Sequence, residues 1–173
     1  VSAYSLSSLV LAHSASIFVT TISEQAVIDT RQTQDGAQVG GSVSVTALMS
    51  IAGAIHAGQD AVVVSAGAIT GEITTGTGTV SVRTGASLSA STHAHGNVDM
   101  TVIGDLTGDV SSSNGGVSIL CTDNLTQSVT AASGVSITAG GYVSGDIHVT
   151  GTGDASLSAA EYISGDVTVD DGN

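Results

Sequence analysis

Residues 142–149 read Tyr-Val-Ser-Gly-Asp-Ile-His-Val, and residues 162–169 read Tyr-Ile-Ser-Gly-Asp-Val-Thr-Val. The second stretch repeats the first after 20 residues, with apolar and polar residues in the same places. A fixed period of about 20 to 50 residues is typical of proteins that stack one structural unit on the next. The two stretches therefore predict a repeat architecture, and the rest of the chain can be aligned with them.

The apolar residue that follows each of these tyrosines has a counterpart along nearly the whole chain. These opening residues are 18 to 23 positions apart: Leu6, Ile28, Ile51, Ile69, Leu88, Leu106, Leu125, Val143 and Ile163. A second apolar residue comes four positions later in seven copies: Val10, Ile55, Ile73, Val110, Val129, Ile147 and Val167. Thr92 takes this place in the fifth copy, and the second copy offers only Gln32 or Thr33. The alignment predicts one domain over residues 1–173, with looser coils over 1–50 and regular coils over 51–173.

Each copy also contains two apolar residues separated by one residue. These pairs are Ile17/Val19, Val43/Val45, Val62/Val64, Val80/Val82, Val98/Met100, Val117/Ile119, Val135/Ile137 and Ala155/Leu157. Small side chains often follow, at Ala47, Ala66, Cys121, Ala139 and Ala159. A period of two with β-branched residues is typical of strands. Because one coil cannot bury its apolar residues alone, the coils must stack. We expect an all-β, single-stranded parallel β-helix (β-solenoid) of eight to nine coils, about 4.8 Å apart.

The expected corners are marked by glycine. Gly53, Gly71, Gly108, Gly145 and Gly165 all come two residues after an opening residue, where we expect positive φ angles. The two longer copies predict loops that leave the rod at residues 21–25 and 34–41. Cys121 falls among the small inward positions, which predicts a buried packing thiol rather than a nucleophile.

The amino-acid composition limits the kinds of molecule that this chain can be expected to bind. The chain has 15 acidic residues, two arginines and no lysine, giving a net charge of −13. This balance argues against nucleic acid and against anionic membrane surfaces, both of which attract basic proteins. No run of 18 apolar residues occurs, so we expect no membrane span.

Residues 105–122 and 124–141 carry a resemblance to a known family. They read Asp-Leu-Thr-Gly-Asp-Val-Ser-Ser-Ser-Asn-Gly-Gly-Val-Ser-Ile-Leu-Cys-Thr and Asn-Leu-Thr-Gln-Ser-Val-Thr-Ala-Ala-Ser-Gly-Val-Ser-Ile-Thr-Ala-Gly-Gly. Both resemble the repeats of filamentous-haemagglutinin-type adhesins: L-x-x-x-V/I, a glycine corner, then V-x-L/I-x-A. The resemblance implies a right-handed β-helix within a long bacterial fibre protein, outside the cell or on its surface. The chain departs from that family in its acidity and its lack of lysine.

Acidic residues recur directly after the corner glycines, at Glu72, Asp109, Asp146 and Asp166. Asp146 and Asp166 belong to neighbouring coils, and like charges placed side by side repel each other. A bound Ca²⁺ would relieve this repulsion, with Asp154 of the adjacent Gly-rich turn as a third ligand. The alternative is that these carboxylates are simply solvated corners.

Aromatic and imidazole side chains supply the other candidates. Tyr142 and Tyr162 occupy the same place in adjacent coils, so they form either a platform for a glycan or a stack that stabilises the corner. The histidines at 56, 93 and 148 fall in coils too far apart to share a metal ion. His93 and His95 place two rings on one strand face, as a weak metal site or as ordinary surface histidines.

No residue set in the chain identifies a reaction, so we expect a protein that is not an enzyme. The sequence favours a structural and adhesive segment of a secreted or cell-surface fibre or filament. Its expected partners are copies of itself, through end-to-end or lateral contacts, or neighbouring repeats of a parent chain. The alternative is a calcium- or glycan-binding module on the same scaffold. A carbohydrate-active enzyme is a weaker hypothesis, since two arginines and few aromatics provide little for a sugar cleft.

Overall fold

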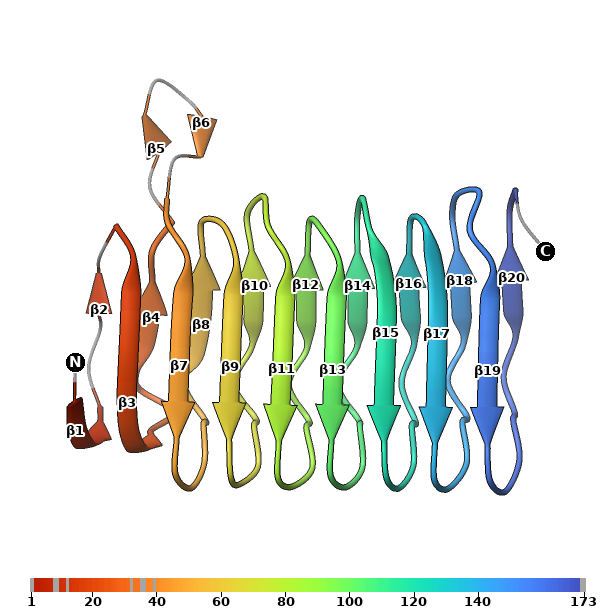
Figure 1. Cartoon of the computed structure of the whole chain (residues 1–173), viewed down its shortest axis with the longest axis horizontal. Helices are drawn as coiled ribbons and strands as arrows, with labels where there is room; N and C mark the ends of the chain where they lie inside the picture. Colours follow the sequence, from red (N-terminus) through yellow and green to blue (C-terminus); the bar gives the residue numbers. More distant parts are fainter. Residues whose placement is uncertain are drawn as a thin grey trace.

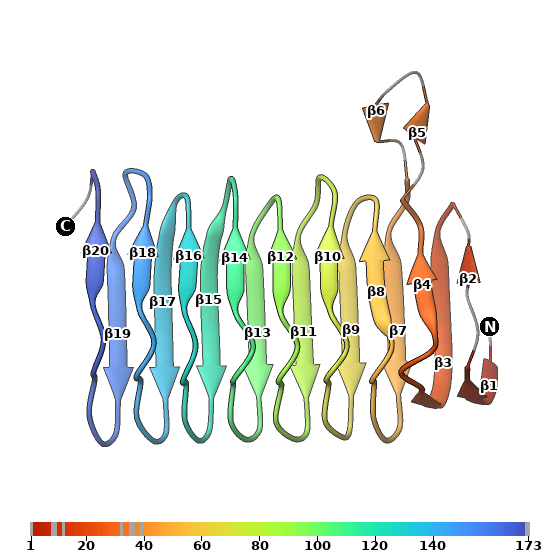
Figure 2. The same ribbon diagram turned by 180° about the vertical axis from the view of Figure 1, so that it is seen from behind.

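The computed structural model describes residues 2–7, 10–11, 13–31, 33–34, 37–38 and 40–171. Within them, the chain winds into a β-solenoid of about eight turns, with parallel strands stacked along one axis (Figure 1). Seen from behind, the strands of the second sheet alternate with those of the first along the rod (Figure 2). No helix in these residues is long and apolar enough to cross a membrane.

Two sheets of nine described strands form the walls, and a short hairpin stands apart. The first sheet contains, in spatial order, β1 (Ser2–Leu6), β3 (Ala15–Ile22), β7 (Val43–Ala47), β9 (Ala61–Ser65), β11 (Val80–Thr84), β13 (Val98–Val102), β15 (Gly116–Cys121), β17 (Gly134–Ala139) and β19 (Ala155–Ala159). The second contains β2 (Val10–Leu11), β4 (Val27–Asp29), β8 (Ala54–Ala57), β10 (Ile73–Thr75), β12 (Thr92–Ala94), β14 (Val110–Ser112), β16 (Val129–Ala131), β18 (Ile147–Val149) and β20 (Val167–Val169).

The opening residues form one continuous ladder, which is buried from Leu6 to Val143, as expected, except in the second coil. There the ladder runs from Leu6 through Ile22 to Ile51, so Ile22 is the opening residue. Ile28 pairs instead with Val10 and Ile55, which places it in the ladder of second apolar residues. The assignment of Ile28, and with it Gln32 or Thr33, is therefore wrong. A wider corner separates Ile22 from Ile28 and hides the usual spacing of four.

In the third coil, the predicted inward-facing positions are wrong by one residue. Ala61 and Val63 are buried at 1% and 0% exposure, whereas Val62 and Val64 are 44% and 37% exposed. The run from 61 to 64 is apolar throughout, so its pattern does not distinguish inward from outward positions. The partner strand decides, because Val80 pairs with Ala61. The small inward residue is accordingly Ser65 rather than Ala66.

The corner glycines are required mainly by close stacking rather than by positive φ. Of the five, only Gly165 has a φ in the left-handed region, at 122°. A side chain at Gly145 would instead collide with the carbonyl oxygen of Gln127 in the preceding coil. The expectation of positive φ at all five positions is therefore wrong, although the corners themselves are confirmed.

One of the two expected loops leaves the rod. The hairpin of β5 (Thr33–Gln34) and β6 (Ala37–Gln38) is antiparallel and projects from the corner between β4 and β7 (Figures 1 and 2). It overlaps the predicted loop at 34–41, of which residues 35, 36 and 39 lie outside the described part. The loop predicted at 21–25 does not form, because Thr21 and Ile22 end β3 and a tight turn follows, in which Ala26 N–H donates to the Ser23 carbonyl at 3.0 Å.

Candidate functional site

The two tyrosines lie where the repeat predicts them. The rings of Tyr142 and Tyr162 stack with centroids 4.9 Å apart and planes 4° from parallel. Tyr142 is partly buried, and Tyr162 is 52% exposed. Stacking of this kind holds adjacent corners together and leaves part of one aromatic surface open to solvent.

The structure brings two of the three candidate calcium ligands together. Asp146 and Asp166 lie in successive coils, and the backbone N–H of Asp166 donates to Asp146 Oδ1 at 3.0 Å. Asp154 lies at a different corner, where its carbonyl accepts the N–H of Val135 at the start of β17. Among the described residues, no three His, Cys, Asp or Glu side chains are grouped as metal ligands. Asp154 therefore does not complete the set with the other two.

The bond between Asp146 and Asp166 belongs to a wider pattern that the sequence reading missed. At the corner before the opening residues, Asp105 N–H donates to Ser87 Oγ at 3.2 Å, and Asn124 N–H donates to Asp105 Oδ1 at 3.1 Å. Tyr142 N–H then donates to Asn124 Oδ1 at 3.1 Å. Each side chain accepts the N–H at the same position of the next coil. Its sequence signal is a polar residue directly before the opening residue in successive copies.

At a second corner, side chains accept backbone N–H groups of the next coil in the same way. Asp60 Oδ1 accepts the N–H of Thr79 at 2.8 Å, and Asn97 Oδ1 accepts the N–H of Gly116 at 2.9 Å. A backbone N–H near the surface must find an acceptor where the ladder is interrupted. The carboxylates of Asp60, Asp105 and Asp146 thus have a structural role that needs no metal ion.

Histidines on the second sheet contact hydroxyls of the following coil. The Nδ1 atom of His56 lies 2.7 Å from Thr74 Oγ1, and that of His93 lies 2.7 Å from Ser111 Oγ. His95 Nδ1 lies 3.1 Å from Ser113 Oγ. These partners are 18 residues apart in sequence, so only the coil register places them side by side.

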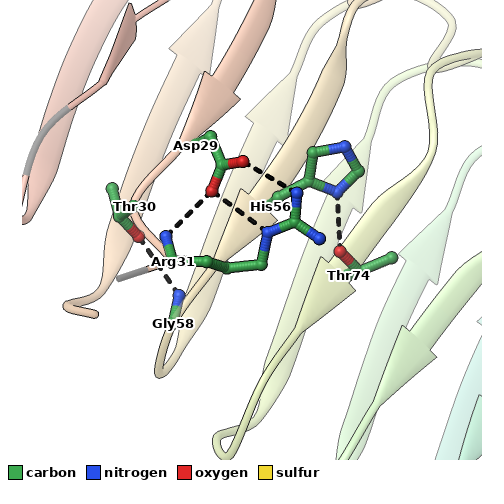
Figure 3. A network of polar contacts seen from close by, with 6 residues as sticks. All are labelled: Asp29, Thr30, Arg31, His56, Gly58 and Thr74. Carbon is green, nitrogen blue, oxygen red and sulfur yellow. Dashed lines mark hydrogen bonds and ion pairs between the residues drawn. The ribbon is translucent and has the colours of Figure 1, made fainter. Parts of the chain in front are cut away.

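The base of the hairpin holds a compact polar network (Figure 3). Arg31 binds the Asp29 carboxylate with both Nη2 and Nε, at 2.7 and 3.1 Å, which lowers the pKa of Asp29. Burial, aided by the nearby positive charge of Arg31, lowers the pKa of His56. Below these groups, Thr30 is fully buried; it donates to the Gly41 carbonyl at 2.6 Å and accepts the N–H of Gly58 at 3.2 Å. The network fixes the two strands from which the hairpin projects.

Cys121 is buried in the column of small inward residues, as expected. Burial, together with the charges of Asp105 and Asp123, raises the pKa of its thiol to about 11. Because the thiolate is the reactive form, the folded chain holds this cysteine in its inert state at neutral pH.

The described surface has several shallow depressions, and two of them include residues discussed above. One, of about 380 Å³, lies at the corner where Gly116 and Gly134 stand between Asn97 and Asp154. The other, of about 250 Å³, lies over β10, β12 and β14 and includes His93 and His95. No protein-family model, curated protein or solved structure matches the chain.

Proposed function

We propose that the chain is a structural and adhesive segment of a secreted or cell-surface fibre, in which stacked coils form a stiff rod that joins end to end. The observation that carries the proposal is that the same apolar surface recurs from coil to coil. Val143 and Ile147 are 0% and 1% exposed because Ile163 and Val167 of the following coil cover them in the same ladders. A coil of a second copy, or of a neighbouring repeat in a parent chain, would cover such a surface in the same way.

Backbone groups also join one coil to the next. Along the rod, each coil donates to the next, as when Val143 N–H donates to the Tyr162 carbonyl at 3.0 Å. An unpaired strand edge with apolar residues behind it is a template for another strand. The N-terminal coil of a second copy would continue both the ladders and the hydrogen bonds, and this is the contact we propose.

Electron microscopy and sedimentation of the isolated chain test this function. We expect rods that lengthen with protein concentration, in steps of one chain length of roughly 40 Å, given nine strands at about 4.8 Å. Val167→Asp should abolish lengthening, because a charge would be buried at the joint. Val62→Asp is the matched control, since Val62 is 44% exposed on the wall rather than the end. Discrete single rods at every concentration would refute end-to-end assembly.

A glycan-binding module is the second candidate, favoured by the half-exposed Tyr162 ring in its stack. An aromatic face is a common surface for a sugar ring. A glycan array with the intact chain should then give binding that Tyr162→Ala removes and that Phe18→Ala, a change at an aromatic ring 50% exposed on the wall, leaves unchanged. Equal signals for both variants would exclude the tyrosine stack as the platform.

Calcium binding is proposed only for the adjacent pair Asp146 and Asp166. Addition of Ca²⁺ should raise the melting temperature, and Asp166→Asn should remove the increase. Asp109→Asn, an exposed corner acid in another coil, serves as the control. A melting temperature that is the same in Ca²⁺ and in chelator would leave backbone capping as the role of these residues.

A further inference from the structure

His93 and His95 form a pair on the outer wall of the second sheet. Ala94 between them is buried at 6% exposure, and both histidines are exposed. His93 lies in β12, and His95 directly follows the last residue of that strand. Among the described histidines, only these two are separated by a single residue.

The next coil holds both rings in the same way. Ser111 and Ser113 are likewise two positions apart, and each meets the Nδ1 atom of the ring beside it, at 2.7 and 3.1 Å. Both rings therefore lean toward the same coil. Within the described residues, the Nε2 atom of neither ring has a hydrogen-bond partner.

This hydrogen-bond arrangement is the one that metal-binding histidines in proteins usually have. A ligating imidazole usually donates its second ring N–H to an oxygen acceptor, which fixes the tautomer and the ring orientation. If Nδ1–H donates to a serine Oγ, the lone pair lies on Nε2 and faces outward. A serine hydroxyl accepts such a bond readily, since it is both donor and acceptor.

The surface around the pair leaves space for a hydrated ion. The depression of about 250 Å³ is lined by both histidines, both serines and Gly76, which has no side chain to fill the place beside His95. One water occupies about 30 Å³ in the liquid, so several can enter this volume. The net charge of −13 also raises the concentration of cations near the surface.

We propose that His93 and His95 chelate one transition-metal ion through their Nε2 atoms, with water in the other positions. Two imidazoles suit Zn²⁺, Ni²⁺ and Cu²⁺, with Cu²⁺ bound most tightly, and do not suit Ca²⁺ or Mg²⁺. This metal site does not involve the end-to-end contact proposed above, so the two proposals are independent of each other.

Titration of the whole chain with Ni²⁺, in buffer at 0.15 M salt with excess Ca²⁺, tests the proposal. The excess Ca²⁺ occupies carboxylates that attract any divalent cation. Calorimetry should give one site per chain, and NMR should show the rings of His93 and His95 perturbed first. His93→Gln or His95→Gln should each weaken binding by about tenfold or more, and the double variant Ser111→Ala/Ser113→Ala by about tenfold.

The double variant His56→Gln/His148→Gln is the control and should bind Ni²⁺ as the original chain does. His93, His95 and Ser113 are exposed, and His56, Ser111 and His148 are half-buried, so the circular dichroism of every variant should be unchanged. Equal loss in the control, an unchanged isotherm in His93→Gln, or complete competition by Ca²⁺ would each overturn the proposal, since each points to diffuse attraction by carboxylates.

Discussion

Thr92 is the one hydroxyl residue in a described ladder that is otherwise apolar. It lies between Ile73 and Val110 and is fully buried. Among the described residues, its Oγ1 atom has no hydrogen-bond partner. A buried hydroxyl without a partner loses its bonds to water and gains none in return, which costs about 1–3 kcal/mol.

Thr92→Val should therefore stabilise the rod, by about 1 kcal/mol or more, because it keeps the shape and removes the unsatisfied hydroxyl. Thr84→Val is the matched control, since Thr84 is also buried but its Oγ1 donates to the Gly67 carbonyl at 2.8 Å. This second change should destabilise the protein. Urea denaturation of the two variants measures both effects, and a loss of stability in Thr92→Val would contradict the account of this ladder.

Asp105 tests the corner hydrogen bonds. It accepts both the N–H and the side-chain Nδ2 of Asn124, at 3.1 and 2.9 Å. We expect Asp105→Ala to lower the free energy of unfolding by about 1–2 kcal/mol, because it removes the acceptor of two hydrogen bonds that each contribute about 0.5–1.5 kcal/mol. Asp109→Ala removes the same charge from the same coil without removing a cap. If both variants lose equal stability, the corner carboxylates do not act through these bonds.

At the scale of elements, the alternation of apolar and polar residues predicts which side chains of most strands face inward. It does not predict them where every residue in a run is apolar. The pairs in β11, β13, β15 and β17 face inward as expected. In β9 every residue from 61 to 64 is apolar, so only pairing with β7 and β11 selects the inward set. The prediction for the second coil is wrong for another reason. Its wider corner and its hairpin change the spacing between apolar residues by which a coil is recognised in the sequence.

The register of β9 can be tested directly. Val63→Ala should cost about 2 kcal/mol, since each buried methylene contributes about 0.8 kcal/mol and a cavity adds to the loss. Val62→Ala changes the same atoms on the exposed side and should stay within about 0.5 kcal/mol. Chemical denaturation of the two variants decides the register. The reverse order of stabilities would restore the register in which Val62 and Val64 face inward.

At the scale of the whole molecule, charge opposes the stacking of coils. The chain has fifteen acidic residues and two arginines, and Arg31 is already paired with Asp29. The remaining carboxylates repel one another over distances that salt shortens. In 0.01 M salt this range is about 30 Å, nearly the length of the rod, and in 0.15 M salt it is about 8 Å.

The melting temperature should accordingly rise by a few degrees between these two salt concentrations, because about 1 kcal/mol corresponds to about 2–4 °C in a chain of this size. The double variant Asp109→Asn/Asp123→Asn should melt higher in low salt and respond less to added NaCl. Thermal scans followed by circular dichroism measure both. A melting temperature that falls with salt would mean that attraction between charges, not repulsion, dominates.

The sequence by itself determined that this chain is a solenoid. Apolar residues recur every 18 to 20 positions from Ile51 onward, and they can be buried only if coils stack. This requirement does not depend on which polar residues lie between them. Only the tertiary structure decided what the polar residues do. Asp146 meets the N–H of Asp166, and His93 and His95 meet Ser111 and Ser113, because coil register brings together residues 18 to 20 positions apart. A pattern along one chain shows which residues recur, but contact between coils decides which atoms pair.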